Sequence, residues 1–282
     1  MQAVRIDTND FAAGLREEIT ANRVRLPTLP DVALRIKAAV EAESSAREIA
    51  ALVAQDIALS GRLVQIANSP LYRGAAEVDS IRVAVTRLGT RLVKAFVIGQ
   101  AFRQLFDTSS VVLAKLFLEI CQDGFQVAAI SRVLAETSPD IDPEEAMLGG
   151  LLHNIGALPI LARLDEARAD DIDAIDVQAL VDELAPEIGT RILKSWELSK
   201  ALVAVPEGCH ALERDSGPRI DCVDIVLAAR LQYLFCEGLI DLTPEISNLP
   251  ALAKLGIQFE TIVLEQESTA VWATQIRNTL DP

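Results

Sequence analysis

The sequence predicts an all-α fold, and three observations lead to that class. Half of the 282 residues are hydrophobic, yet only 4% are aromatic. Ala, Leu, Val and Ile dominate, a mixture that favours packed helices over strands, whose interiors prefer aromatic and β-branched side chains. Apolar side chains also recur at helical spacing behind residues that cap helix starts. This length and composition supply enough apolar material for one large or two modest domains.

The first third of the chain is predicted to form short helices. Ser45 with Glu48 has the spacing of a capping box, and Asp56 and Ser80 stand at further N-cap positions. Leu26–Pro30 is expected to form an extended kink, because each proline restricts the residue before it. The predicted helices run from residue 7 or 8 to about 22, from 31, from 45 to near 55, from 57 to 67, from 80 to a pause at Gly89, and from 91 to 106.

A long helix over 109–136 is predicted to be the central element that joins two lobes. After it, Asp142, Pro143 and Glu145 form a strong helix start, with an acidic cap, a proline in the first turn and a capping-box partner. His153–Asn154 is expected to lie on this helix. The remaining expected segments are an acidic surface loop over 165–176 and helices over 177–184, 186–196, 199–213, 219–237 and 259–280.

The net charge argues against two broad classes of partner. A formal charge of −15 and a pI near 4.6 oppose attraction to nucleic acid and to anionic lipid surfaces. The N-terminus lacks the basic start and the apolar stretch of a secretory signal. The apolar run 146–162 contains His153, Asn154 and Pro159 and is shorter than the roughly 20 residues that cross a bilayer. We therefore expect a buried helix there, and a cytoplasmic protein without membrane or nucleic-acid contacts.

Several chemistries lack their defining motifs. The four cysteines form no CxxC pair, which argues against a zinc knuckle and a thioredoxin-type site and favours reduced thiols in the core. The sequence also has no GxGxxG after a strand, no GxxxxGK[ST] loop and no GxSxG elbow, as dinucleotide-binding, P-loop and hydrolase-elbow proteins would require. Gly149–Gly150 lies in a helical pattern, where missing side chains are expected to let helices approach closely. The cysteines are Cys121, Cys209, Cys222 and Cys236.

The most informative motif is the run Leu151-Leu152-His153-Asn154-Ile155-Gly156. An Asp after His153 would complete the metal-binding doublet of the HD phosphohydrolases, but an amide stands there instead. Asn154 offers an oxygen lone pair, yet it brings no negative charge to hold a divalent cation or to lower the pKa of a bound water. Because His153 and His210 are the two histidines of the chain, one subunit cannot assemble a three-histidine centre.

Two separated stretches resemble the HD-related output domain, HDOD, a bacterial regulatory relative of the HD phosphohydrolases. The stretches are Leu26–Pro30, 49–56, Leu63–Ser69 and Ile81–Gly89 in the first part, and Glu144–Gly156, Glu187–Gly189 and Trp196–Leu198 in the second. Together they span about residues 20–235. The resemblance implies one HDOD module with an N-terminal helical lobe over 1–108, a degenerate HD-like lobe over 109–282 and a C-terminal helical extension.

The same resemblance implies that most metal ligands are missing. The histidine that precedes the doublet in an active HD enzyme falls near Asp123, and the late aspartate falls near Ala229. The degenerate HD site would then consist of His153, Asn154, Asp123 and His210, with one formal negative charge. We therefore expect no catalytic residue, no metal and no cofactor. A buried, hydrogen-bonded helix histidine is the expected role of His153, and a divergent metal-dependent phosphohydrolase of nucleotides or phosphate esters is the alternative.

A basic island in the first lobe supports a second hypothesis about binding. Arg82, Arg87, Arg91 and Lys94 could take a small phosphorylated ligand or dock an acidic partner. The last three share a helix face only if Gly89 does not break the helix. The alternative is a solvated face that balances the acidic second lobe. By resemblance, the function is non-catalytic signal transduction through protein or ligand binding, with signalling proteins as partners and a homodimer as one arrangement.

Overall fold

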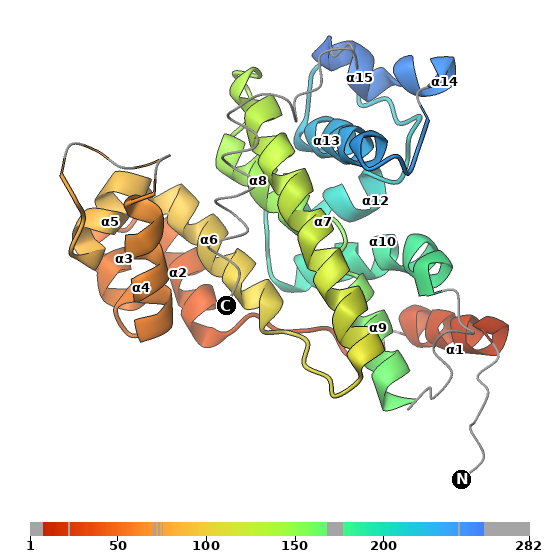
Figure 1. The fold of residues 1–282 in the computed structure, drawn as a ribbon, viewed down its shortest axis with the longest axis horizontal. Coiled ribbons are helices and arrows are strands. Elements are labelled where there is room, and N and C mark those ends of the chain that lie inside the picture. Colours follow the sequence, from red (N-terminus) through yellow and green to blue (C-terminus); the bar gives the residue numbers. More distant parts are fainter. Residues whose placement is uncertain are drawn as a thin grey trace.

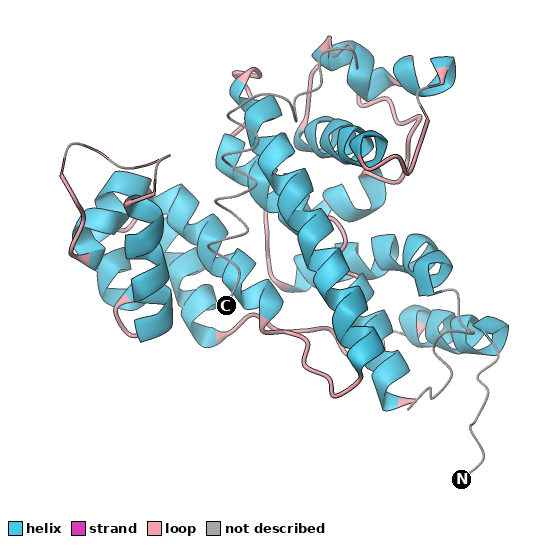
Figure 2. Cartoon of the chain, in the orientation of Figure 1, coloured by secondary structure: helices cyan, strands magenta, loops and turns pink. Residues whose placement is uncertain are grey.

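The computed structural model describes residues 8–21, 23–69, 72, 74, 76–167, 177–241 and 243–256. Helices form all of the regular secondary structure in these ranges, and no strand occurs among them (Figure 2). The all-α prediction is confirmed. Two groups of helices lie side by side, with the first group at the left of Figure 1 and the second group to its right.

The first lobe contains five short helices, and two of them start at the capping residues that the sequence indicates. Ser45 and Glu48 form the complete capping box, and the Asp56 side chain accepts a hydrogen bond from the Leu59 amide. Ser80 precedes a helix as expected, but its side chain makes no capping hydrogen bond. The helices are α2 (Asp31–Glu41), α3 (Ala46–Val53), α4 (Ile57–Ala67), α5 (Ile81–Leu88) and α6 (Thr90–Arg103).

The second lobe is built around the long central helix that the sequence predicts. Its helices are α7 (Val111–Glu136), α8 (Pro143–Leu152), α9 (Ala157–Glu166), α10 (Val177–Ser195), α11 (Lys200–Val203), α12 (Val205–Gly208), α13 (Cys222–Cys236), α14 (Pro244–Ser247) and α15 (Pro250–Leu255). Helix α13 packs against α7 and α8 (Figure 1). Most of its buried side chains are apolar, so α7, α8 and α13 form the centre of the core.

Helices α7 and α8 pack closely because glycine lies at their contact. A Cβ atom added at Gly150 would lie 2.7 Å from the Cα atom of Ala128, and one added at Gly124 would lie 3.0 Å from the Leu151 carbonyl oxygen. Both distances are too short for a relaxed contact, so the missing side chains permit the approach. The expectation of close packing at Gly149–Gly150 is confirmed.

The first helix, α1 (Thr8–Thr20), lies beside α9 and α10 in the second lobe (Figure 1). Arg16 pairs with Glu183 on α10, and Glu18 lies 3.4 Å from Arg163 on α9. The division at residue 108 placed this helix in the first lobe. The difference arises because Leu15 and Ile19, with 3% and 2% of their surface exposed, bury their side chains in the core beside the second lobe.

Three other helix boundaries differ from the prediction. Helix α10 runs through Pro186 without interruption, since the flanking Ala185 and Ile188 are buried and packing outweighs the lost backbone hydrogen bond. The range 199–213 contains two short helices, α11 and α12, followed by a loop in place of one helix. Helix α9 extends to Glu166, into the range expected to be loop. The helix expected over 259–280 lies outside the described residues.

The two lobes contact each other through α6 and α8. Arg91 on α6 forms an ion pair with Asp142, the N-cap of α8, at 3.0 Å. In addition, the Trp196 indole N–H donates to the Pro27 carbonyl oxygen at 2.8 Å, which attaches the chain before α2 to the end of α10. The described lobes are therefore linked by polar contacts as well as by the covalent chain.

One stretch, Pro143–Glu166, is long and apolar enough to cross a membrane by length and composition. In the fold, 83% of its most apolar window is buried against other helices, as in the core of a globular domain. The stretch is also divided between α8 and α9. The expectation that this stretch is buried is confirmed, although it forms two helices instead of one.

Candidate functional site

The His153–Asn154 doublet lies in the turn between α8 and α9. Helix α8 ends at Leu152, and His153 is its C-cap residue, so the doublet follows the helix instead of lying on it. The turn lies against α10 so closely that a Cβ atom at Gly156 would be 1.9 Å from the Ala185 carbonyl oxygen. The sequence indicated one continuous helix here because the apolar pattern does not change across the turn.

His153 is a buried, neutral histidine with 2% of its surface exposed. Its Nδ1–H donates to the Gly150 carbonyl oxygen at 2.7 Å, so the proton is on Nδ1 and the lone pair is on Nε2. Burial lowers the pKa of His153 to about 3, and the positive charge of Arg230 adds to that effect. The expected buried, hydrogen-bonded role of this histidine agrees with these contacts, with a backbone carbonyl as the partner.

His210 follows α12 and lies near His153. Its Nε2 atom is buried and has no hydrogen-bond partner among the described residues. Burial lowers the pKa of His210 to about 4, again with a contribution from Arg230. The preceding Cys209 is fully buried, and burial raises the pKa of its thiol to about 12, so the thiol is protonated and unreactive at neutral pH.

Arg230 is the residue of this site that the sequence did not reveal. It lies on α13, partly buried, and donates from Nη1 to the Cys209 carbonyl oxygen at 3.3 Å. Its charge affects the pKa of both histidines, of Cys209 and of Asp123, which places the guanidinium among them. The sequence contains one hint of this role: Arg230 is the one basic residue in the mostly apolar helix 222–236, and it follows Ala229, the position where the resemblance expects an aspartate.

Asp123 is held away from a ligand role. Its carboxylate accepts a short hydrogen bond from the Tyr233 hydroxyl, which joins α7 to α13. Burial raises the pKa of Asp123, and the hydrogen bond from Tyr233 opposes that shift. Asn154 is partly exposed and adds no charge to the cluster. The two histidines and Asp123 thus lie near Arg230, but Asp123 is already bonded to Tyr233.

The residues present do not fit a divalent metal ion. No group of three or more His, Cys, Asp or Glu side chains in the described ranges is arranged to hold one. Two neutral imidazoles and one hydrogen-bonded carboxylate form a weak donor set. The fixed positive charge of Arg230 beside these donors would also repel a dication. We call His153, His210, Asp123 and Arg230 the Arg230 cluster.

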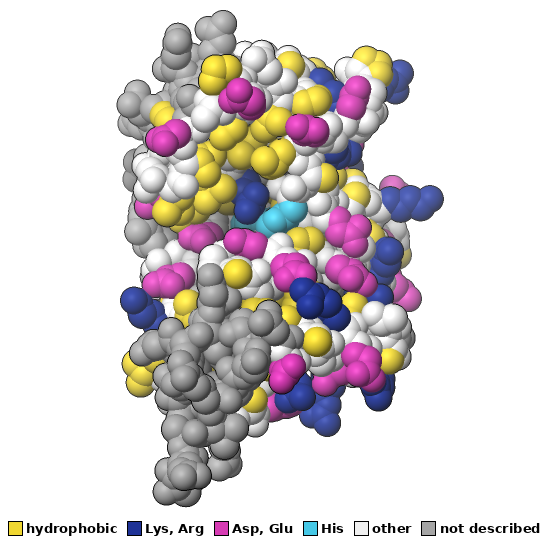
Figure 3. Space-filling view, turned by 90° about the vertical axis from the view of Figure 1, so that its right-hand side faces the viewer, with side chains coloured by type: hydrophobic (Ala, Val, Ile, Leu, Met, Phe, Trp, Pro, Cys, Tyr) yellow, Lys and Arg dark blue, Asp and Glu magenta, His cyan; other side chains and the backbone are white. Residues whose placement is uncertain are grey.

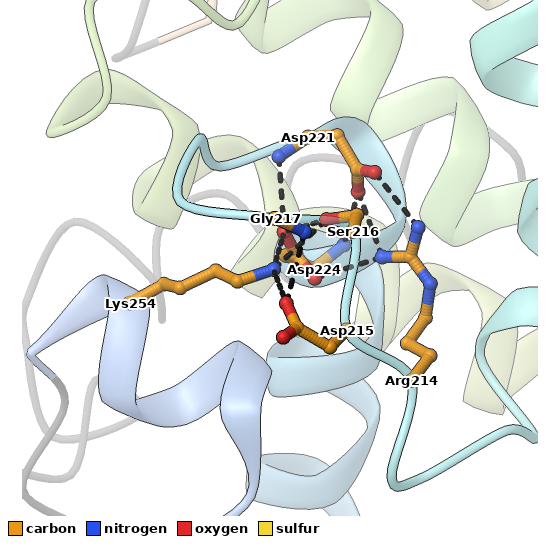
Figure 4. A network of polar contacts seen from close by, with 7 residues as sticks. All are labelled: Arg214, Asp215, Ser216, Gly217, Asp221, Asp224 and Lys254. Carbon is orange, nitrogen blue, oxygen red and sulfur yellow. Dashed lines mark hydrogen bonds and ion pairs between the residues drawn. The ribbon is translucent and has the colours of Figure 1, made fainter.

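The loop that carries His210 is anchored by a buried ionic network (Figure 4). Asp224 on α13 is fully buried and accepts from Arg214 at 2.7 Å and from Lys254 of α15 at 3.2 Å. Asp221 caps α13 in a capping box and also accepts from Arg214. Burial would raise the pKa of Asp221, but the hydrogen bonds from Arg214 and the Asp224 amide lower it overall. The network therefore holds the loop 209–221 against α13.

The basic residues of the first lobe do not form one continuous helical face. Gly89 has a φ of 81° and separates α5 from α6, so the register from Arg87 to Arg91 and Lys94 is interrupted. The Arg87 guanidinium donates to the Ala67 and Ala76 carbonyl oxygens at 3.2 and 2.8 Å, and it thereby closes the loop before α5. Arg82 is exposed. Arg87 is thus engaged in local structure.

Arg91 and Lys94 instead line a cavity between the lobes. The cavity has a volume of about 270 Å³ and is bordered on the α8 side by Asp142, Glu144 and Glu145. Asp142 pairs with Arg91, and Glu144 pairs with Arg132 at 3.0 Å. The cleft therefore presents basic groups on one wall and already bonded acidic groups on the other.

The described residues form an HD-like, all-helical domain in which two neutral histidines lie beside Arg230. The family model of the HDOD domain matches residues 26–211, well over half of the chain. The chain therefore belongs to the HDOD domain family.

Three relatives show how far the similarity extends. A Shewanella amazonensis protein described as a candidate metal-dependent phosphohydrolase is 26% identical, with a TM-score of 0.81 over 97% of this chain and 99% of the other. A Marinobacter aquaeolei VT8 protein described as a candidate signal transduction protein is 21% identical, with a TM-score of 0.64 over 98% and 67%. A Treponema pallidum (strain Nichols) protein is 22% identical over 83% of this chain, which spans only 46% of that protein.

Proposed function

We propose that the chain is a cytoplasmic regulatory module of bacterial signal transduction that acts by binding and not by metal-dependent hydrolysis. The observation that carries the proposal is the Arg230 cluster, where a guanidinium accompanies two neutral histidines. A hydrolase of the HD type would need acidic ligands around a metal ion to generate its nucleophile. Here the Asp123 carboxylate is bonded to Tyr233 instead.

The kind of partner follows from charge and from the relatives. The protein carries a net charge of −15, which disfavours nucleic acid and anionic membranes. The Marinobacter aquaeolei VT8 relative is described as a signal transduction protein, which supports signalling proteins as partners. Arg82 and the cleft residues Arg91 and Lys94 offer basic groups to an acidic partner or a small phosphorylated ligand. A homodimer is a further arrangement that fits this role.

The competing function is a divergent metal-dependent phosphohydrolase, which the description of the Shewanella amazonensis relative favours. Metal analysis and turnover of phosphoesters separate the two. We expect the purified full chain to contain no stoichiometric divalent ion and to show no phosphoester turnover that depends on His210. The control variant is His210→Gln, because His210 is the more exposed of the two histidines. Stoichiometric Mn²⁺, Fe²⁺ or Zn²⁺ together with His210-dependent turnover would overturn the proposal.

A gain-of-function variant sharpens this test. Asn154→Asp restores the acidic member of the doublet without changing its size. We expect the variant still to bind no metal, since Arg230 remains and Asp123 stays bonded to Tyr233. Metal uptake by Asn154→Asp alone would show that Arg230 does not exclude the ion, and it would contradict the electrostatic argument.

A further inference from the structure

The Arg230 guanidinium has an unusual environment for so acidic a protein. It is partly buried, and it forms no ion pair with a carboxylate of the described residues, although the chain has 41 Asp and Glu residues. The carbonyl oxygen of Cys209 is its hydrogen-bond acceptor in those ranges. A guanidinium offers five N–H donors in a planar fork, so most of its donors remain available.

Among the neighbours of Arg230 in the cluster, Asp123 is the negatively charged side chain, and the two histidines add only neutral hydrogen-bonding atoms. The buried Nε2 atom of His210 has no partner among the described residues. His153 uses Nδ1 for the Gly150 carbonyl and leaves Nε2 for another group. Asp123 is the acidic side chain whose charge acts on Arg230, and its oxygen accepts from Tyr233. The cluster is therefore a cation beside two imidazoles.

The cluster reaches the molecular surface. Figure 3 shows a histidine side chain in a hollow of one face, with a basic side chain beside it, an apolar area above it and acidic side chains below. The chain has two histidines, and His210 is the more exposed of them. Both His210 and Arg230 are only partly buried, so the cluster lies close to the surface, although the Nε2 atom of His210 is itself covered. Acidic side chains near such a site would oppose large polyanions.

We propose that Arg230, together with His210, forms a binding site for a single phosphoryl group, so that a guanidinium stands where the resemblance to HD enzymes implies a metal ion. Arg230 binds two of the phosphoryl oxygens through its fork, and His210 donates from Nε2 to a third. A phosphoryl group fits better than a carboxylate, because its three terminal oxygens can meet donors that come from different segments. The inference rests on the proposed binding function and names the ligand class for it.

Titration of the intact protein with inorganic phosphate tests this site. The solutions contain a chelator, so that a metal–phosphate complex cannot form, and chloride holds the ionic strength constant. We expect phosphate to raise the melting temperature of the wild type, since a ligand that binds only the native state stabilises it. Arg230→Gln should weaken binding at least tenfold, whereas Arg25→Gln, which alters an arginine 94% exposed at its side chain, should leave it unchanged.

Histidine NMR gives a second readout if Arg230→Gln does not fold. Because the wild-type chain has two histidines, their ring signals can be distinguished with one substitution, His210→Gln. Phosphate should shift the His210 signal, and acetate at equal ionic strength should not. Equal melting shifts in the wild type and Arg230→Gln, or an unmoved His210 signal at millimolar phosphate, would overturn the site. If phosphate does not bind, the regulatory proposal is still tested independently by the measurements of metal content and phosphoester turnover.

Discussion

At the scale of single residues, the chemistry of the site depends on the protonation of two histidines. His153 and His210 have pKa values lowered to about 3 and about 4, because burial disfavours their charged forms. Both are therefore neutral at physiological pH. Their neutrality is compatible with metal binding in general, so the decisive residue is Arg230, whose positive charge lies where a metal ion would need acidic ligands.

The lowered pKa values predict a loss of stability on acidification. In the unfolded chain these histidines titrate near pH 6.5, so the unfolded state binds more protons than the native state between about pH 6.5 and 4. The stabilisation is fully present above pH 6.5 and falls as the pH drops. Between pH 7 and 5 we expect a loss on the order of 1–2 kcal/mol for each histidine.

Urea unfolding at several pH values measures this effect. His210→Gln should flatten the pH dependence by the share of one histidine, because glutamine does not titrate in this range. A wild-type stability that is constant between pH 7 and 5, or an unchanged slope in His210→Gln, would show that His210 is not buried in its neutral form.

At the scale of helices, the close contact between α7 and α8 depends on glycines, which have no side chain at the contact. Gly150 lies against the backbone of Ala128, and the His153–Asn154 doublet follows directly after α8 ends at Leu152. A displacement of α8 therefore moves His153 with it. The long helix α7, the capping box at Ser45 and the cap at Asp56 could be predicted from sequence, because each signal is local.

Gly150→Ala is expected to destabilise the protein by about 1–3 kcal/mol, since the new methyl group would overlap the α7 backbone and force the helices apart. Gly61→Ala is the matched control. Gly61 lies in α4 with nothing within 4 Å of an added Cβ atom, so alanine there should stabilise by about 0.5–1 kcal/mol. Thermal or urea unfolding measures both, and equal effects of the two variants would contradict the packing argument.

Other features required tertiary information that a sequence pattern does not contain. The turn at 153–156 interrupts an apolar run without any change of composition, because the backbone of α10 determines where the chain can pass. Pro186 remains inside α10 through burial of its neighbours. Arg230 acquires its role from Cys209, which is distant in sequence and close in space.

At the scale of the whole molecule, the folded unit is larger than the family match. The HDOD match ends at residue 211, whereas α13 buries Ala228 and Ala229 with at most 1% of their surface exposed. Helix α1 also packs against the second lobe from outside the matched range. The core formed by α7 and α8 is complete only when these later and earlier helices are present.

Residues 26–211 expressed alone are therefore expected not to fold cooperatively, because the loss of α13 exposes the apolar faces of α7 and α8. Far-ultraviolet circular dichroism with urea unfolding, and size-exclusion chromatography, compare this segment with the full chain. We expect a broad transition or aggregation for the segment and a sharp transition for the full chain. A sharp two-state transition of the segment would show that α13 is an accessory element.

The turn at Gly156 restricts which substitutions the sequence accepts there. Exchange of one polar side chain for another at position 153 or 154 would leave the backbone of the turn where it is. A side chain at Gly156 would collide with the Ala185 carbonyl, so this position admits almost no change without moving the whole turn. The position of the turn is therefore set by the packing of Gly156 against α10, whichever polar side chains occupy positions 153 and 154.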